Sequence, residues 1–177
     1  MADVKVQQLI IGILICAIGL MCCILTAGAF GTHLDCENPT YAVVCKHKLD
    51  FRLSINYWFD EDEYNMLEFH MNRIKAHLAV FIGEIILAFM GLSLVLTRLF
   101  GLIQSKSNEG KADLCVTIFG VLIAIAAACG ECFFALGYYM QNQFYGMVVV
   151  DSWYVSTAGL AVIAIIFLAD SILICVR

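Results

Sequence analysis

Two cysteines separated by two residues, Cys129 and Cys132, form a CxxC motif. Such a pair supports thiol–disulfide exchange where a thiolate is accessible, because the thiolate is the attacking species. Here the motif lies inside a long apolar segment. Cysteine is also a small apolar residue that packs well between helices. We therefore interpret Cys129 and Cys132 as packing residues and keep a membrane thiol–quinone oxidoreductase as the alternative.

Two opposite charges, Arg98 and Asp170, lie within other apolar segments. Each lies about 8–9 Å along a helix from the same predicted end of a membrane bundle. Charges in hydrocarbon are costly and usually pair or face water. We predict an ion pair between them across the bundle; the alternative is that Arg98 extends to the lipid headgroups by itself.

Two carboxyl groups, Glu84 and Glu131, are predicted at matching depth, about 12–14 Å from the opposite end. We expect no basic residue of the last three helices beside them. They would then be protonated or share a proton, hydrogen-bonded for instance to Ser156 or Thr157. The alternative is a cation, or a partner's Lys or Arg, held between them.

The chain lacks the residue patterns of an enzyme. It contains no phosphate-binding glycine loop and no Ser-x-x-Lys or His-Glu-x-x-His motif. The four histidines, His33, His47, His70 and His77, do not fall at metal-ligand spacing. We therefore predict no catalytic residue, no metal and no cofactor.

These residues belong to a chain with a membrane protein's composition. Of 177 residues, 62% are hydrophobic and 14% are charged, and the net charge is −5. This excludes a disordered chain, makes a soluble globule unfavourable and gives no basic footprint for nucleic acid. The apolar segments are each long enough to span a bilayer. They are Leu9–Phe30, Ala76–Ile103, Leu114–Met140 and Trp153–Val176.

The first segment has an alternative interpretation, because Ala27-Gly28-Ala29 is similar to a signal-peptidase site. We expect instead a single four-helix domain. Small residues along the helices favour close helix packing. They are Gly12, Cys16, Gly19 and Cys23 in the first segment and Gly120, Ala124 and Ala128 in the third.

The connecting loops set the orientation. Loop 104–113 carries Lys106 and Lys111, whereas loop 141–152 carries no Lys or Arg. The positive-inside rule places loop 104–113 and both termini in the cytoplasm. Loops 31–75 and 141–152 are then extracellular.

Cys36 and Cys45 are the cysteines outside the apolar segments, on the oxidising side of the membrane, and we predict a disulfide between them. Residues 36–45 and 51–57 have the pattern of strands, and so has Met147–Val150. Strands from both extracellular loops are expected to form one small sheet.

A large first loop with a cysteine pair and a small second loop resemble the claudin and peripheral-myelin-protein superfamily, which includes the calcium-channel γ subunits. The superfamily motif is G-L-W-x-x-C followed by a second cysteine. Gly31, Cys36 and Cys45 match it, whereas His33 stands in the tryptophan position. The resemblance is to a divergent, short-tailed member. It implies an all-α bundle of four membrane helices with a small extracellular antiparallel sheet.

The resemblance implies non-catalytic roles. The first is cell contact or junction organisation at the plasma membrane through the extracellular sheet, by self-association or with another membrane protein. The alternative is an auxiliary subunit of a channel or receptor. The less favoured enzyme alternative resembles vitamin K epoxide reductase, with the CxxC as its redox pair. Near the cytoplasmic ends, Cys115 and Cys175 are candidates for palmitoylation.

The predicted disulfide has a testable consequence. A small extracellular sheet has little core and depends on such a cross-link. We expect Cys36→Ser or Cys45→Ser to lower the surface level of the tagged protein strongly, measured by labelling intact cells. Wild-type surface levels for both variants would contradict this prediction.

Overall fold

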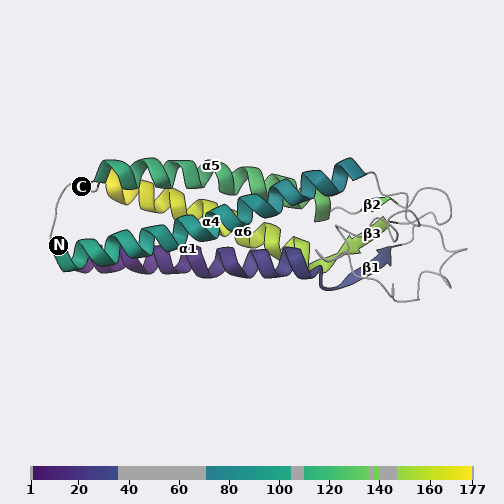
Figure 1. The fold of residues 1–177 in the computed structure, drawn as a ribbon, viewed down its shortest axis with the longest axis horizontal. Coiled ribbons are helices and arrows are strands. Elements are labelled where there is room, and N and C mark those ends of the chain that lie inside the picture. Colours follow the sequence, from purple (N-terminus) through teal and green to yellow (C-terminus); the bar gives the residue numbers. More distant parts are fainter. Residues whose placement is uncertain (1, 36–70, 105–109, 136–137, 140–146, 177) are drawn as a thin grey trace, which may run out of the picture.

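Four long helices run side by side in the computed structural model, which describes residues 2–35, 71–104, 110–135, 138–139 and 147–176. The helices are α1 (Ala2–Gly28), α4 (Met71–Gln104), α5 (Gly110–Ala135) and α6 (Asp151–Cys175). Both chain termini lie at one end of the bundle, and short strands lie at the other (Figure 1). We call these the terminal end and the sheet end.

Each helix contains a stretch that is long and apolar enough to cross a membrane. These stretches are Val6–Gly28, Ala76–Phe100, Asp113–Ala135 and Asp151–Cys175. Large apolar side chains cover the outer surface, among them Phe89, Phe119 and Ile165, which are 66%, 63% and 65% exposed. Such a surface is stable in lipid and unfavourable in water. The chain is therefore a multi-pass membrane protein.

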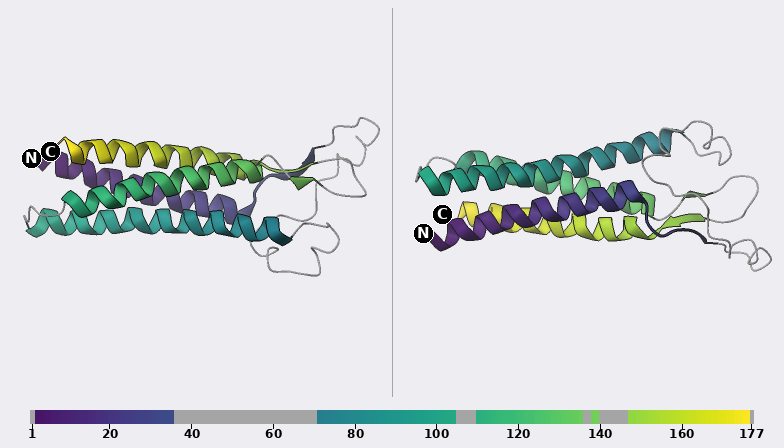
Figure 2. Two further views of the ribbon diagram at one scale, coloured as in Figure 1. Left: turned by 90° about the horizontal axis from the view of Figure 1, so that it is seen from above. Right: turned by 60° about the horizontal axis from the view of Figure 1, so that its bottom comes forward.

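The helices form a ring rather than a layer. Helix α1 packs on α4 and α6, and α5 packs on the same two helices from the other side. Figure 2 shows this arrangement from two further directions. All four helices contribute to the apolar core between them. Its fully buried members include Ile15, Leu87, Ala124, Leu160 and Phe167.

Small residues allow the helices to approach closely, as the sequence predicts. A Cβ atom added to Gly19 of α1 would lie 3.1 Å from the Cα atom of Ala88 in α4. At Gly91 of α4 it would lie 2.6 Å from the backbone nitrogen of Cys16. Gly120 of α5 likewise leaves room for the ring of Phe167. These contacts are within the bundle, so the stripe on α1 is used internally.

A three-stranded antiparallel sheet continues from the helices at the sheet end (Figure 1). Strand β1 is Thr32–Asp35, β2 is Tyr138–Tyr139 and β3 is Met147–Val150. Strand β3 is central: β1 pairs with it from Thr32↔Val150 to Asp35↔Met147, and β2 pairs on its other side. The segment Met147–Val150 is thus a strand, as its β-branched residues indicate. The predicted strands at 36–45 and 51–57 lie outside the described residues.

The third helix ends earlier than its apolar composition predicts. We expected it to reach Met140, but α5 ends at Ala135. Tyr138 instead pairs with Val148 in the sheet. Pairing in a sheet requires an extended backbone, so tertiary contacts override the helical preference of an apolar segment.

A tight junction joins α1 to α6 and to the sheet. After α1, Ala29 and Gly31 adopt left-handed conformations with φ of 44° and 74°. The amide of Ser152 donates to the carbonyl of Phe30 at 3.0 Å. A Cβ atom at Gly31 would lie 2.6 Å from Oδ2 of Asp151. Glycine is therefore required at position 31 by both backbone conformation and space.

Replacing Gly31 tests this junction. We expect Gly31→Ala to lower the free energy of unfolding by about 1–3 kcal/mol, since it adds left-handed strain and a steric clash. Gly83→Ala is the matched control, because a Cβ there meets Ala127 at an ordinary 3.8 Å. Unfolding of both variants in detergent by heat or denaturant provides the measurement. Equal stabilities of the two variants would show that the junction does not need glycine.

Candidate functional site

Five buried polar side chains meet near the sheet end of the bundle, and every helix contributes at least one. Helix α1 provides Thr26, α4 provides His77 and Glu84, α5 provides Glu131 and α6 provides Ser156. Each is at most 1% exposed. We call this group the sheet-side cluster.

The hydroxyl of Thr26 lies at the centre of the cluster. Its Oγ1 atom is within hydrogen-bond distance of Glu84 Oε1 (2.9 Å), Glu131 Oε1 (3.0 Å) and Ser156 Oγ (3.1 Å). Ser156 Oγ also donates to Glu84 Oε1 at 2.8 Å. The two glutamates therefore lie at the same depth and share a threonine of the first helix.

Thr26 and His77 are the members of the cluster that the sequence analysis did not place beside the glutamates. The Nε2 atom of His77 lies 2.9 Å from Glu131 Oε2. The expectation that no basic residue of the last three helices lies near the two glutamates is therefore wrong. A signal was present, because His77 and Glu84 are seven residues apart and so occupy one face of a helix.

Aromatic rings enclose the imidazole and fix its position. The ring of Phe134 stacks on His77 at 4.3 Å, and Trp153 meets it edge-on at the same centroid distance. The indole Nε1 of Trp153 donates to the carbonyl of Thr26 at 3.1 Å. These contacts connect the cluster to the end of α1, where the sheet begins.

Of the two hydroxyl groups expected near the glutamates, one is in the cluster and one is not. Ser156 contacts Glu84, whereas Thr157 donates to the carbonyl of Trp153 in its own helix at 2.9 Å. Consecutive residues of a helix point about 100° apart, so both cannot face the same neighbour.

A second polar group lies toward the terminal end, and it too draws on all four helices. Arg98 of α4 donates through Nη2 to Asp170 of α6 and through Nη1 to the Gln8 carbonyl of α1 at 2.6 Å. Its Nε atom is 3.7 Å from Asp113 Oδ2 of α5. We call Gln8, Arg98, Asp113 and Asp170 the terminal-side cluster.

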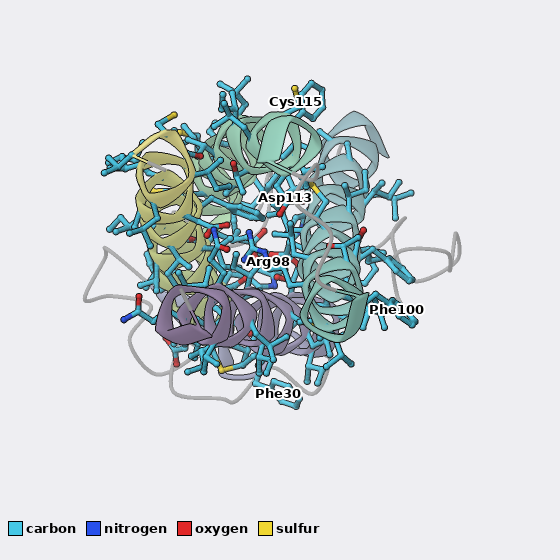
Figure 3. The ribbon with its side chains drawn as sticks, turned by 90° about the vertical axis from the view of Figure 1, so that its left-hand side faces the viewer. Phe30, Arg98, Phe100, Asp113 and Cys115 are labelled. Atoms are coloured by element: carbon cyan, nitrogen blue, oxygen red, sulfur yellow. The ribbon has the colours of Figure 1, made fainter. Side chains whose placement is uncertain are left out.

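The predicted ion pair between Arg98 and Asp170 is confirmed. Figure 3 shows Arg98 and Asp113 inside the ring of helices, whereas Phe100 and Cys115 point outward. Arg98 is 6% exposed, so it does not extend to the lipid headgroups by itself. Pairing and hydrogen bonding offset part of the cost of burying its charge.

Four cysteines of α5 and α6 are exposed on the surface of the bundle. Cys129 and Cys132 are exposed on α5, while Glu131 between them is fully buried. Cys115 and Cys175 are also exposed, and their palmitoylation stays a prediction. Cys36 and Cys45 lie outside the described residues, and so does their predicted disulfide. Within the described parts of the chain, no group of three or more His, Cys, Asp or Glu side chains is placed to hold a metal ion.

The arrangement of the sheet-side cluster supports one kind of chemistry, the holding of protons. It contains carboxyl, hydroxyl and imidazole groups in continuous hydrogen-bond contact. Its members are enclosed by helices, so a substrate has no direct access to them. The cluster therefore joins the four helices through hydrogen bonds between buried polar groups.

No match to the chain was found among protein-family models, curated proteins or solved structures. The class of protein thus comes from the fold: a multi-pass membrane protein whose four apolar helices enclose two polar clusters.

Charge exchange tests the terminal-side cluster. Arg98→Asp or Asp170→Arg places like charges together in the bundle, and we expect each to cost about 3–5 kcal/mol of unfolding free energy. The double exchange restores an opposite pair and should recover part of this loss. Recovery is partial because the Gln8 carbonyl and Asp113 both favour a cation at position 98.

Thermal unfolding of the four proteins in one detergent gives the comparison. A double variant no more stable than the single variants would show that the two positions act independently.

Proposed function

We propose that this protein is a non-catalytic membrane protein of the plasma membrane that acts in cell contact or junction organisation through its sheet end. The main support for this proposal is the position of the charged residues within the membrane-spanning helices. Glu84, Arg98, Glu131 and Asp170 are all buried among the helices. The bilayer-facing surface of the described helices is left apolar, with no charged side chain between their ends.

This surface limits how a partner is recognised. A partner's Lys or Arg cannot reach Glu84 or Glu131 without opening the bundle, since both are 0% exposed. Apolar contact in lipid has no hydrophobic driving force, because lipid tails are as apolar as the side chains. Selective recognition then belongs to the parts outside the membrane. Among the described elements, the sheet end combines strands from different parts of the chain, which suits that role.

The sheet end provides a platform that joins both predicted extracellular loops. Strand β1 belongs to the first loop and β3 to the second, and they pair over four residues on each strand. The hydrogen bond from Ser152 to Phe30 connects this pair to the helices. Residues of both loops thus belong to one surface, which suits contact with another protein.

The orientation rests on charge and on the arrangement of the ends. Both termini lie at the end opposite the sheet (Figure 1). Loop 104–113, with Lys106 and Lys111, connects α4 to α5 at the terminal end. The positive-inside rule makes that end cytoplasmic and the sheet end extracellular.

The claudin-like resemblance supports the same proposal at one residue. Gly31, the glycine of the motif, is the position where a side chain would clash with Asp151. The lack of space for a side chain therefore explains why the motif glycine is needed at the start of the sheet. The superfamily's roles in cell contact are the source of the particular function that we propose.

The thiol–quinone oxidoreductase has less support. Cys129 and Cys132 lie on the outward face of α5, and the acid between them points into the sheet-side cluster. The helix therefore separates the thiols from the buried acid–base groups. As exposed residues, Cys129 and Cys132 also do not fill a contact between the described helices, contrary to the packing interpretation of the CxxC motif.

The decisive experiment is localisation in mixed cell cultures. We expect the tagged full-length protein to be enriched several-fold where two expressing cells touch, relative to contacts between expressing and non-expressing cells. The second type of contact is an internal control for membrane overlap. Uniform surface distribution together with co-purification of a channel would instead identify an auxiliary subunit. Retention in an internal membrane would contradict the plasma-membrane assignment.

A further inference from the structure

The hydrogen-bond contacts of the sheet-side cluster outnumber the protons that its hydroxyl groups and imidazole supply. We propose that Glu84 is a proton-binding site within the membrane and that its carboxyl group is protonated at neutral pH. Its proton begins a hydrogen-bond chain that passes through Thr26 and ends on the carboxylate of Glu131.

The count of donors at Thr26 leads to this assignment. Its hydroxyl has a single proton, yet it lies within 3.0 Å of one oxygen of each glutamate. If both glutamates were ionised, one of these contacts would place a carboxylate oxygen against a hydroxyl lone pair. A proton on Glu84 Oε1 removes the conflict. Glu84 then donates to Thr26, and Thr26 donates to Glu131.

An unpartnered atom independently indicates that Glu84 binds a proton. Glu84 is fully buried, and its Oε2 atom has no hydrogen-bond partner among the described residues. In a carboxylate this oxygen would carry half of a negative charge without solvent or a donor, which is very unfavourable. In a neutral carboxylic acid it is only a carbonyl oxygen, whose burial costs much less.

The proton belongs to Glu84 rather than to Glu131. Oε2 of Glu131 lies 2.9 Å from His77 Nε2, so an N–H donor is available to its carboxylate. The neighbours that the structure gives Glu84 are hydroxyl groups, from Thr26 and Ser156. A negative charge is therefore better stabilised on Glu131 and a proton better placed on Glu84.

The titratable groups around Glu84 come from three helices. Helix α1 presents Cys22 and Cys23, α4 presents His77 and α5 presents Glu131. Helix α6 contributes Ser156, which does not titrate in this range. The imidazole reaches Glu131 and not the unpartnered oxygen of Glu84. None of these groups replaces the proton on Glu84.

The spacing of the oxygen atoms favours a proton over a metal ion. Neighbouring oxygens in the cluster are 2.8–3.1 Å apart, which is hydrogen-bond distance. Calcium at 2.3–2.6 Å from each ligand would separate adjacent oxygens by about 3.3 Å or more. Magnesium retains several waters, for which oxygens already in mutual contact leave no space.

Infrared spectroscopy of the full-length protein tests the proposal directly. A protonated carboxyl gives a carbonyl band distinct from that of a carboxylate, and a maltoside detergent adds no ester carbonyl of its own. At pH 7 we expect such a band in the wild type, and labelling glutamate with carboxyl ¹³C should shift it. Absence of the band, or failure of the label to shift it, would overturn the proposal without any substitution.

Two matched variants then assign the proton. The band should disappear in Glu84→Gln and persist in Glu131→Gln. Asp170→Asn is the control, because Asp170 is a buried acid whose ion pair with Arg98 keeps it ionised. This variant should therefore retain the band of the protonated carboxyl group. Loss of the band in Glu131→Gln with retention in Glu84→Gln would place the proton on the other glutamate and overturn the assignment.

Thermal unfolding provides an independent readout. Glutamine has the shape of a neutral glutamic acid, so Glu84→Gln should unfold within a few degrees of the wild type. Glu131→Gln removes the ionised partner of His77 and should unfold at a clearly lower temperature. Repeating the wild-type measurement with sodium replaced by choline distinguishes a cation. A sodium-dependent midpoint that Glu84→Gln abolishes would show that the site binds sodium instead.

Discussion

Hydrocarbon offers no hydrogen bonds, so every polar group carried into it by a membrane helix must find its partner within the protein. This bundle meets that constraint with two polar clusters, each assembled from all four helices. Glu84 and Arg98 lie on the same helix about 21 Å apart. The space between them is filled by apolar side chains. Because each cluster needs all four helices, losing one helix would leave buried charges without partners.

The sheet-side cluster and the sheet are structurally linked. Thr26 holds the two glutamates through its hydroxyl, and its carbonyl accepts from Trp153. A few residues later, Phe30 accepts from Ser152 and the chain turns through Gly31 into β1. A change in the hydrogen bonding of the cluster therefore acts on the base of the sheet through a few short contacts. This places the intramembrane protons and the surface outside the membrane in one continuous structure.

The charged side chains within the membrane-spanning helices are buried in the bundle. The protein therefore has an apolar lateral surface and a more polar surface at its ends. The sides of the bundle carry large apolar residues such as Phe89 and Ile165, which suit lipid. The sheet end carries backbone pairing between strands of the two predicted extracellular loops. The buried charges thus stabilise the bundle, and the function that we propose places recognition at the sheet end. Outward-facing cysteines fit this division, since cysteine is a small hydrophobic residue.

The sequence by itself determined the four membrane helices, because length and hydrophobicity decide whether a segment enters lipid. It also determined the pairing of Arg98 with Asp170, since each is the opposite charge nearest in depth. Tertiary structure decided the rest. Sheet pairing ended α5 at Ala135 against its apolar composition. Whether His77 faces Glu131, and whether Thr26 joins the two glutamates, depends on how four helices are rotated against one another. That rotation is set by close packing at small residues such as Gly19 and Gly91, which sequence periodicity does not resolve.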